Sequence, residues 1–253
     1  MSGRDGVLVA LETSGPTGSV ALARGGEPLG QLFLRGDSAH AARLVPALSQ
    51  LLAEAGVERW ELSGVVVGGG PGSFTGVRVA AATAKGLVHA MGVPLRAISS
   101  LEAGAVADRV PAPVAGGPWD VPEGLTEGLH DPTREETRWI LFDARGDRVY
   151  AACYRVRPDG IEVLHRPRAD RVGRLLAEPR RAGLHYAGSG AIRHRATIEA
   201  AGGRVLPPPA GMPTAAGLLH VLALRGGVDP VEDPWAWEPD YLRASGAERK
   251  RKG

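Results

Sequence analysis

The chain has 253 residues with 43% hydrophobic residues and a formal net charge of +2, the composition of an ordinary soluble protein with one large or two small domains. Residues 248–253 alone carry a charge of +3, so the rest of the chain carries −1, which argues against a broadly basic nucleic-acid surface. The single cysteine, Cys153, lies in an apolar strand pattern and excludes an intramolecular disulfide and a cysteine-based zinc site.

The N-terminal sequence MSGRDG lacks the basic and apolar regions of a signal peptide. The most apolar predicted helix contains Arg78, Lys85 and His89, which a membrane-spanning segment would not tolerate. We therefore expect a cytoplasmic protein with no membrane partner.

Strands and helices are predicted in turn along the first 110 residues. Apolar runs separated by glycine turns predict three antiparallel strands over 7–12, 19–23 and 29–34. Leucines at helical spacing predict an amphipathic helix over 44–55, with Ser38 as its candidate cap. The series continues with a strand, a helix, a strand and a helix, over 65–68, 77–91, 95–99 and from 101 onward. Alternation of this kind predicts an α/β fold.

The glycine-rich run GGGPGSFTG, residues 68–76, lies between a β-branched strand and a helix for which Ser73 or Thr75 is a candidate cap. Such a loop either brings an anion or another backbone close to helix N–H groups, or makes a turn that larger side chains would block. Gly76 and Val77 stand where a Walker loop needs glycine and lysine, and no glycine triplet has the dinucleotide-binding spacing. We favour a tight turn that packs against a partner over phosphate binding by this chain alone.

The sequence after residue 110 predicts a second lobe behind an insertion. Residues 111–138 are rich in proline, glycine and charge, as in an exposed insertion or linker. Strand and helix patterns resume over 139–211 and predict a smaller α/β lobe. A helix over 214–224 is expected to return to the first lobe, which comprises 1–110 and 212–247. Residues 248–253 form a basic, solvated tail.

Several short motifs occur along nearly the whole chain apart from the insertion. They are Leu11-Glu12-Thr13-Ser14, His40-Ala41-Ala42-Arg43-Leu44, Gly70-Pro71-Gly72-Ser73-Phe74-Thr75-Gly76 with Arg78, Ala84-Lys85-Gly86-Leu87, Ser99-Ser100-Leu101-Glu102, Asp143-Ala144-Arg145 with Val149-Tyr150, and Pro239-Asp240-Tyr241-Leu242-Arg243. With these motifs the chain resembles the TsaB family.

The resemblance implies a two-lobed actin/Hsp70/sugar-kinase-like (ribonuclease H-like) fold with mixed sheets. It implies a scaffold without catalytic activity, bound to a TsaD-like paralogue that transfers a threonylcarbamoyl group to an adenosine beside the tRNA anticodon. Further implied partners are a second copy of the chain, a TsaE-like ATPase reached through the complex, and tRNA, contacted only indirectly. We expect no intrinsic cofactor, while ATP or ADP is compatible with the interface of the complex.

We predict no metal-binding residue. The resemblance implies that the paralogue holds its metal with a His-x-x-x-His pair, but here His40 is followed four positions later by Leu44. One imidazole cannot make such a two-histidine face, so we interpret His40 as a polar residue at a helix start.

We also predict no catalytic residue. Ser14 and Ser73 have no nearby histidine and acid to activate them. In catalytic members of the superfamily, an acid at the position of Glu12 and a glycine turn hold a magnesium-bound nucleotide. Pro16 removes an N–H donor from that turn here, which predicts a weakened or absent phosphate site.

The predicted helix over 77–91 carries apolar residues on more than one face, whereas a helix covered only by its own sheet needs one stripe. Small residues such as Ala80 and Ala84 would let another backbone approach closely. We expect this helix and the 44–55 helix to form the surface for self-association and for the paralogue; the alternative is that both stripes are core. The predicted interface residues are His40, Leu44, Leu48, Gly72, Ser73, Phe74, Thr75, Gly76, Val77, Arg78, Ala80, Ala84 and Val88.

Two other functions stay open. A kinase-like phosphotransferase or ATPase of the same fold is favoured by the glycine loops and Glu12. A direct tRNA-binding module is favoured by the basic tail and by the basic face of the 77–91 helix. The Asp143-Ala144-Arg145 motif is interpreted as a structural hairpin with no assigned chemistry.

Overall fold

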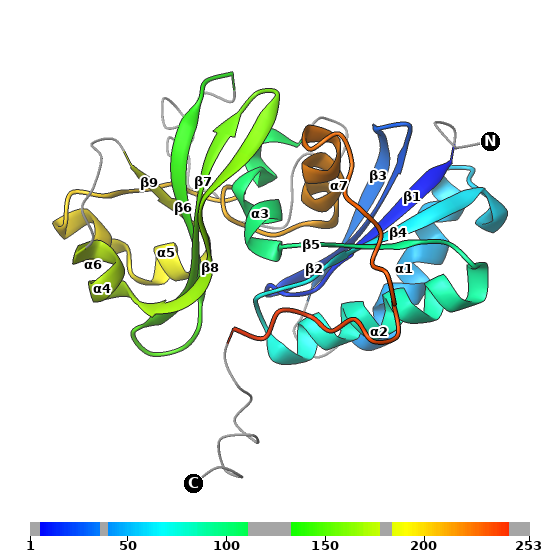
Figure 1. The fold of residues 1–253 in the computed structure, drawn as a ribbon, viewed down its shortest axis with the longest axis horizontal. Coiled ribbons are helices and arrows are strands. Elements are labelled where there is room, and N and C mark those ends of the chain that lie inside the picture. Colours follow the sequence, from blue (N-terminus) through cyan, green and yellow to red (C-terminus); the bar gives the residue numbers. More distant parts are fainter. Residues whose placement is uncertain (1–5, 36–39, 111–132, 178–183, 243–253) are drawn as a thin grey trace, which may run out of the picture.

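The computed structural model describes residues 6–35, 40–110, 133–177 and 184–242, which form two α/β lobes (Figure 1). Its strands are β1 (Val7–Glu12), β2 (Thr17–Arg24), β3 (Glu27–Arg35), β4 (Leu62–Gly68), β5 (Leu95–Ile98), β6 (Glu136–Asp143), β7 (Arg148–Arg157), β8 (Gly160–Arg171), β9 (His185–Ala187) and β10 (Arg204–Val205). Its α-helices are α1 (His40–Glu54), α2 (Phe74–Met91), α3 (Ser100–Ala105), α4 (Val172–Ala177), α5 (Ser189–Arg193), α6 (Arg195–Ala200) and α7 (Ala215–Leu224), and the 3-10 turns η1 (Arg59–Glu61) and η2 (Ala107–Arg109) complete the described elements.

Each lobe contains one five-stranded mixed sheet, and the two sheets repeat the same plan. The orders are β3-β2-β1-β4-β5 in the first lobe and β10-β9-β6-β7-β8 in the second. In the first sheet, β1, β2 and β3 pair antiparallel in turn, β4 lies parallel to β1, and β5 lies parallel to β4. In the second sheet, β6, β7 and β8 pair in the same antiparallel way, β9 lies parallel to β6, and β10 lies parallel to β9. The prediction of a two-lobed α/β fold with mixed sheets is confirmed.

The first sheet is covered on both faces because its strands are apolar on both sides. Val9 and Leu11 of β1 lie in one cluster with the leucines of α1 and with Ala80 and Ala84 of α2. Ala10, between them in sequence, faces the other side and joins residues of α3 and α7. Figure 1 shows the same layers, with α1 and α2 on one face and α3 and α7 on the other.

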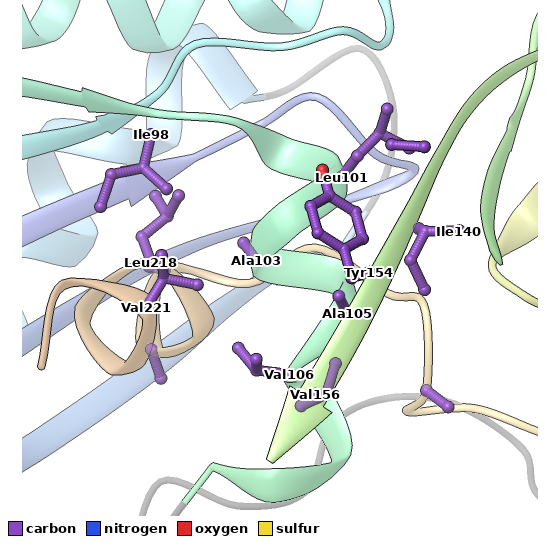
Figure 2. Close-up of a cluster of buried hydrophobic side chains, with 14 of the residues drawn as sticks. Ile98, Leu101, Ala103, Ala105, Val106, Ile140, Tyr154, Val156, Leu218 and Val221 are labelled. Carbon is purple, nitrogen blue, oxygen red and sulfur yellow. The ribbon is translucent and has the colours of Figure 1, made fainter. Parts of the chain in front are cut away.

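A second hydrophobic cluster joins the two lobes. Figure 2 shows Ala103 of α3 between Leu218 of α7 and Tyr154 of the second sheet, with Leu101 of α3 beside Tyr154. Helix α7 is tied to the first sheet by its backbone, because the Ala215 N–H donates to Ser19 Oγ at 2.8 Å. The helix predicted over 214–224 therefore does return to the first lobe.

Three glycines let backbones meet at the joint between the lobes. The Gly211 N–H donates to the Gly104 carbonyl at 2.9 Å. Gly211 has φ +76°, and a Cβ on it would lie 2.0 Å from the backbone nitrogen of Gly188, so no larger residue fits. The joint is therefore a close-packed backbone contact rather than an open linker.

The second lobe begins earlier than predicted. Strand β6 starts at Glu136, inside the segment predicted as an insertion up to residue 138, while 111–132 lie outside the described residues. Arg138 is fully buried and pairs with Asp108 at 2.8 Å and with Glu136, which ties β6 to the turn after α3. The charge-rich sequence predicts an exposed segment, whereas Arg138 is buried and its charge is paired with Asp108 and Glu136.

Among the described helices, none combines the length and the apolar character needed to cross a membrane.

Candidate partner-binding site

The glycine-rich run ends β4 and starts α2, which begins at Phe74, three residues earlier than predicted. Ser73 is its N-cap: Ser73 Oγ accepts from the Gly76 N–H at 3.3 Å. A Cβ on Gly76 would lie 1.9 Å from the carbonyl oxygen of Thr13, and Thr13 Oγ1 donates to the Gly76 carbonyl at 2.6 Å. The glycines therefore allow the start of α2 to press against the segment after β1.

Glu12, at the end of β1, holds this loop from inside the protein. The carboxylate is fully buried, and its Oε1 accepts from the Ser14 N–H at 2.6 Å. Its Oε2 accepts from Ser100 Oγ at 2.8 Å, and Ser100 Oγ in turn accepts from the Gly70 N–H at 3.2 Å. The Ser73 N–H donates to the Ser14 carbonyl at 2.8 Å, which connects Glu12 to the cap of α2. Burial raises the pKa of the Glu12 carboxyl above its usual range.

The end of β1 does not fit a magnesium-bound nucleotide. Both oxygens of Glu12 already accept hydrogen bonds from the chain, and a Cβ on Gly68 would lie 2.1 Å from Glu12 Oε2, so little space surrounds the carboxylate. The turn after β1 is covered as well, since a Cβ on Gly15 would meet the ring of Pro213 at 3.3 Å. Glu12, whose position is compatible with nucleotide binding, supports the glycine loop through Ser14 and Ser100.

An aromatic and cationic cluster is exposed at the start of α2. Phe74 keeps 40% of its surface exposed although it is a large apolar residue. The guanidinium of Arg78, one helical turn later, lies 3.8 Å from the centre of the Phe74 ring, and Arg78 Nε donates to Tyr241 Oη at 3.3 Å. The rings of Phe74 and Tyr241 are 5.6 Å apart. We call these three residues the Phe74 cluster.

The C-terminal segment 228–242 packs against α2 and the core cluster that α2 shares with α1. It runs along α2 in Figure 1, drawn in orange to red, and its Val231 N–H donates to the Leu95 carbonyl at 2.7 Å. Trp237 packs against the α1–α2 core cluster, and the Asp240 N–H donates to the Gly69 carbonyl at 2.7 Å. Asp240 and Tyr241 belong to a family motif in the sequence, but their spacing does not connect them with the glycine loop.

Six of the thirteen predicted interface residues are buried in the core of this chain, and for these six the prediction of a surface position is corrected. Ala80 and Ala84 are fully buried, because the small side chains let α2 approach its sheet. The same correction applies to the other buried members of the predicted set, Leu44, Leu48, Gly76 and Val77. Gly72 and Val88 are partly buried, Ser73, Phe74, Thr75 and Arg78 are exposed, and the side chain of His40 lies outside the described ones.

The basic face predicted on α2 is engaged by the same C-terminal segment. Lys85 Nζ donates to the Trp235 carbonyl at 2.9 Å, and the rings of His89 and Trp235 meet edge to face at 5.4 Å. Arg78 belongs to the Phe74 cluster. Lys85 and His89 therefore contact the chain itself, and RNA binding by this face stays a prediction.

No group of three or more potential metal ligands occurs in the part of the chain that the structure describes. The absence of a metal site stays a prediction.

The two lobes have equivalent strand orders, and α3 and α7 pack between their sheets. The chain therefore has the actin/Hsp70/sugar-kinase type of α/β fold. A family model described as TsaD, tRNA N6-adenosine threonylcarbamoyltransferase, matches residues 36–119. The structure is similar to that of YeaZ from Pseudomonas aeruginosa, with a TM-score of 0.71 and 28% identity over 94% of this chain and 100% of that one.

The sequence is 30% identical to the tRNA threonylcarbamoyladenosine biosynthesis protein TsaB of Bacillus subtilis, with 96% of each chain covered. The TsaB protein of Haemophilus influenzae is 40% identical over 98 residues, which is 38% of this chain and 40% of that protein. The chain belongs to the TsaB family.

Proposed function

We propose that this chain is a non-catalytic scaffold subunit in the synthesis of threonylcarbamoyladenosine in tRNA, and that it docks a TsaD-type catalytic subunit through the start of α2. Membership of the TsaB family supports the pathway, and the match to the TsaD model supports a related partner. The observation that carries the docking surface is the exposed Phe74 cluster, because aromatic and arginine side chains are the residues that most often dominate protein interfaces.

The support under the cluster favours tight docking. Ser73, Glu12 and Gly76 hold the start of α2 from one side, and the segment carrying Tyr241 holds it from the other. A surface that is already ordered loses little conformational entropy on association, so more of the contact energy appears as affinity. The same surface, or the exposed face of α1 beside it, would serve a second copy of the chain.

We propose that this chain has no nucleotide-dependent reaction of its own. The hydrogen bonds of Glu12 favour a chain without its own nucleotide-dependent reaction, and an ATP or ADP molecule is proposed only at the junction with the catalytic subunit. A TsaE-like ATPase would join through that complex. Magnesium-dependent ATP turnover by the chain alone, abolished by Glu12→Gln, would establish the kinase-like alternative instead.

Light scattering on the chain mixed with the TsaD-type protein of the same organism tests the docking surface. We expect Phe74→Ala combined with Arg78→Ala to weaken the mixed complex by about 30-fold, since an interface hot spot contributes about 2 kcal/mol or more. Trp60→Ala is the matched control, because Trp60 is 81% exposed and lies between α1 and β4. Equal affinity of both variants would reject the Phe74 cluster as the docking surface, and no complex with the unaltered chain would reject the scaffold function.

A further inference from the structure

One end of the second sheet gathers arginines. The turn from β6 to β7 and the end of β8 meet there, and the Val172 N–H donates to the Asp147 carbonyl at 2.9 Å. We call this region the arginine end; it contains Arg145, Arg148, Arg171, Arg174 and Arg193 with the acids Asp143 and Asp147. Asp170, next to Arg171, pairs with Arg168 at 3.3 Å, so this pair adds no net charge and the end keeps a formal charge of +3 on a chain whose total is +2. The charge is therefore local rather than a property of the whole surface.

Only two of these arginines have ion-pair partners among the described residues. Arg193 pairs with Asp143 at 2.8 Å, and Arg171 pairs with Asp147 at 3.5 Å. The other three, Arg145, Arg148 and Arg174, are exposed, and their guanidinium groups make no ion pair or hydrogen bond with the part of the chain described.

The backbone holds Arg145 in an unfavourable conformation. Its φ is 68°, and it is the one residue other than glycine with a positive φ in the described ranges. An L-residue in this region costs about 1 kcal/mol. Asp143 stabilises the turn, because Asp143 Oδ1 accepts from the Arg145 N–H at 2.8 Å while Oδ2 accepts from Arg193. The turn therefore presents an arginine where a glycine would fit without strain.

The ladder places two arginines opposite each other. Arg148 on β7 pairs with Arg171 on β8, so their side chains lie on the same face of the sheet. Like charges directly opposite each other destabilise a sheet, and an exposed ion pair such as Arg171–Asp147 returns less than about 1 kcal/mol. Backbone strain at Arg145 and charge repulsion between Arg148 and Arg171 both lower the stability of the folded chain at this end.

We propose that the arginine end binds the phosphate groups of the tRNA backbone, so that this chain contacts the substrate RNA directly. This inference rests on the proposed function, which supplies tRNA as the nucleic acid. Exposed guanidinium groups hold a single small anion weakly, since water competes for both charges. A polyanion binds such a surface because it engages several arginines at once and releases its counterions. Arginine is also suited to phosphate through paired N–H donors.

Fluorescence anisotropy with a full-length tRNA transcript tests the proposal, using the chain alone and the mixed complex with the TsaD-type protein. We expect Arg145→Gln combined with Arg148→Gln to weaken binding about tenfold at moderate salt, and to reduce the slope of log K against log salt by about 1.5. Arg59→Gln combined with Arg204→Gln removes the same charge from exposed positions elsewhere and is expected to bind as the unaltered chain does.

Equal weakening by the two double variants would show a general charge effect and overturn the proposal, as would unchanged binding or no RNA binding in either form. Displacement of the RNA by ATP at equal phosphate concentration would also overturn it, by indicating a small-anion site. Circular dichroism of each variant reports folding, and Arg145→Lys with Arg148→Lys is expected to recover part of the affinity. Light scattering of the same variants reports docking separately, so a failure of the scaffold function is distinguishable from a failure at the arginine end.

Discussion

Replacing Glu12 by alanine tests whether this buried carboxylate supports the glycine loop. The change removes the acceptor for two donors in the interior, the Ser14 N–H and Ser100 Oγ. Each buried donor left without a partner costs about 1–3 kcal/mol. Relief from burying a carboxylate offsets part of this cost, because burial raises the pKa of Glu12 and therefore disfavours its charged form. We expect a net loss of about 3 kcal/mol in the free energy of unfolding.

For a chain of this size, a loss of about 3 kcal/mol lowers Tm by about 6–12 °C. Thermal unfolding followed by circular dichroism measures it, with Glu199→Ala as the control, because Glu199 is an exposed member of an i,i+4 ion pair worth less than about 1 kcal/mol. The pH dependence adds a second readout. The folded protein protonates Glu12 at a higher pH than the unfolded chain does, so the stability of the unaltered chain relative to Glu12→Ala rises as pH falls toward 4.5.

A Tm for Glu12→Ala within about 2 °C of the unaltered chain would refute this reasoning, since a difference that small corresponds to less than about 1 kcal/mol. The loop would then be held by the packing of its glycines and by the segment 228–242, and the hydrogen bonds to Glu12 would be a minor contribution.

Three further outcomes are expected. Ala84→Arg should abolish cooperative folding, because Ala84 is fully buried. Ala82→Arg, on the exposed face of α2, should fold normally. Soluble, folded protein from both variants would show that α2 is not packed as described. His220→Gln should lessen the loss of stability below pH 6.5, because burial lowers the pKa of His220 and only the unfolded chain gains a proton there; parallel pH profiles from urea titrations would contradict this. Arg225→Ala should lower the free energy of unfolding in urea by about 1–3 kcal/mol, because it leaves the buried Glu102 carboxylate without its partner at 2.6 Å. The loss should grow with pH as Glu102 ionises. A change under about 0.5 kcal/mol at pH 8 would contradict this prediction.

The local sequence around Glu12 does not determine what this residue does. An acid at the end of a strand before a glycine turn is compatible with a ligand site and with a structural role. The partner that decides between them, Ser100, lies 88 residues away, and the residues it orders in turn lie in the glycine loop. No spacing rule connects these positions, because the contact arises only when β1 and α3 are placed side by side.

The elements and the family were decided by the sequence itself. Periodicity and glycine turns specify strands and helices over a few residues, and motifs from Leu11 to Arg243 carry the resemblance to TsaB. The burial of α2 was decided by tertiary structure. A helix with two apolar stripes does not record what covers each of them. Here α2 shares one core cluster with α1 and β4, Trp237 packs against that cluster, and Lys85 contacts a residue 150 positions later. Hydrophobic patterning measures how much surface must be buried, whereas the chain path decides what buries it.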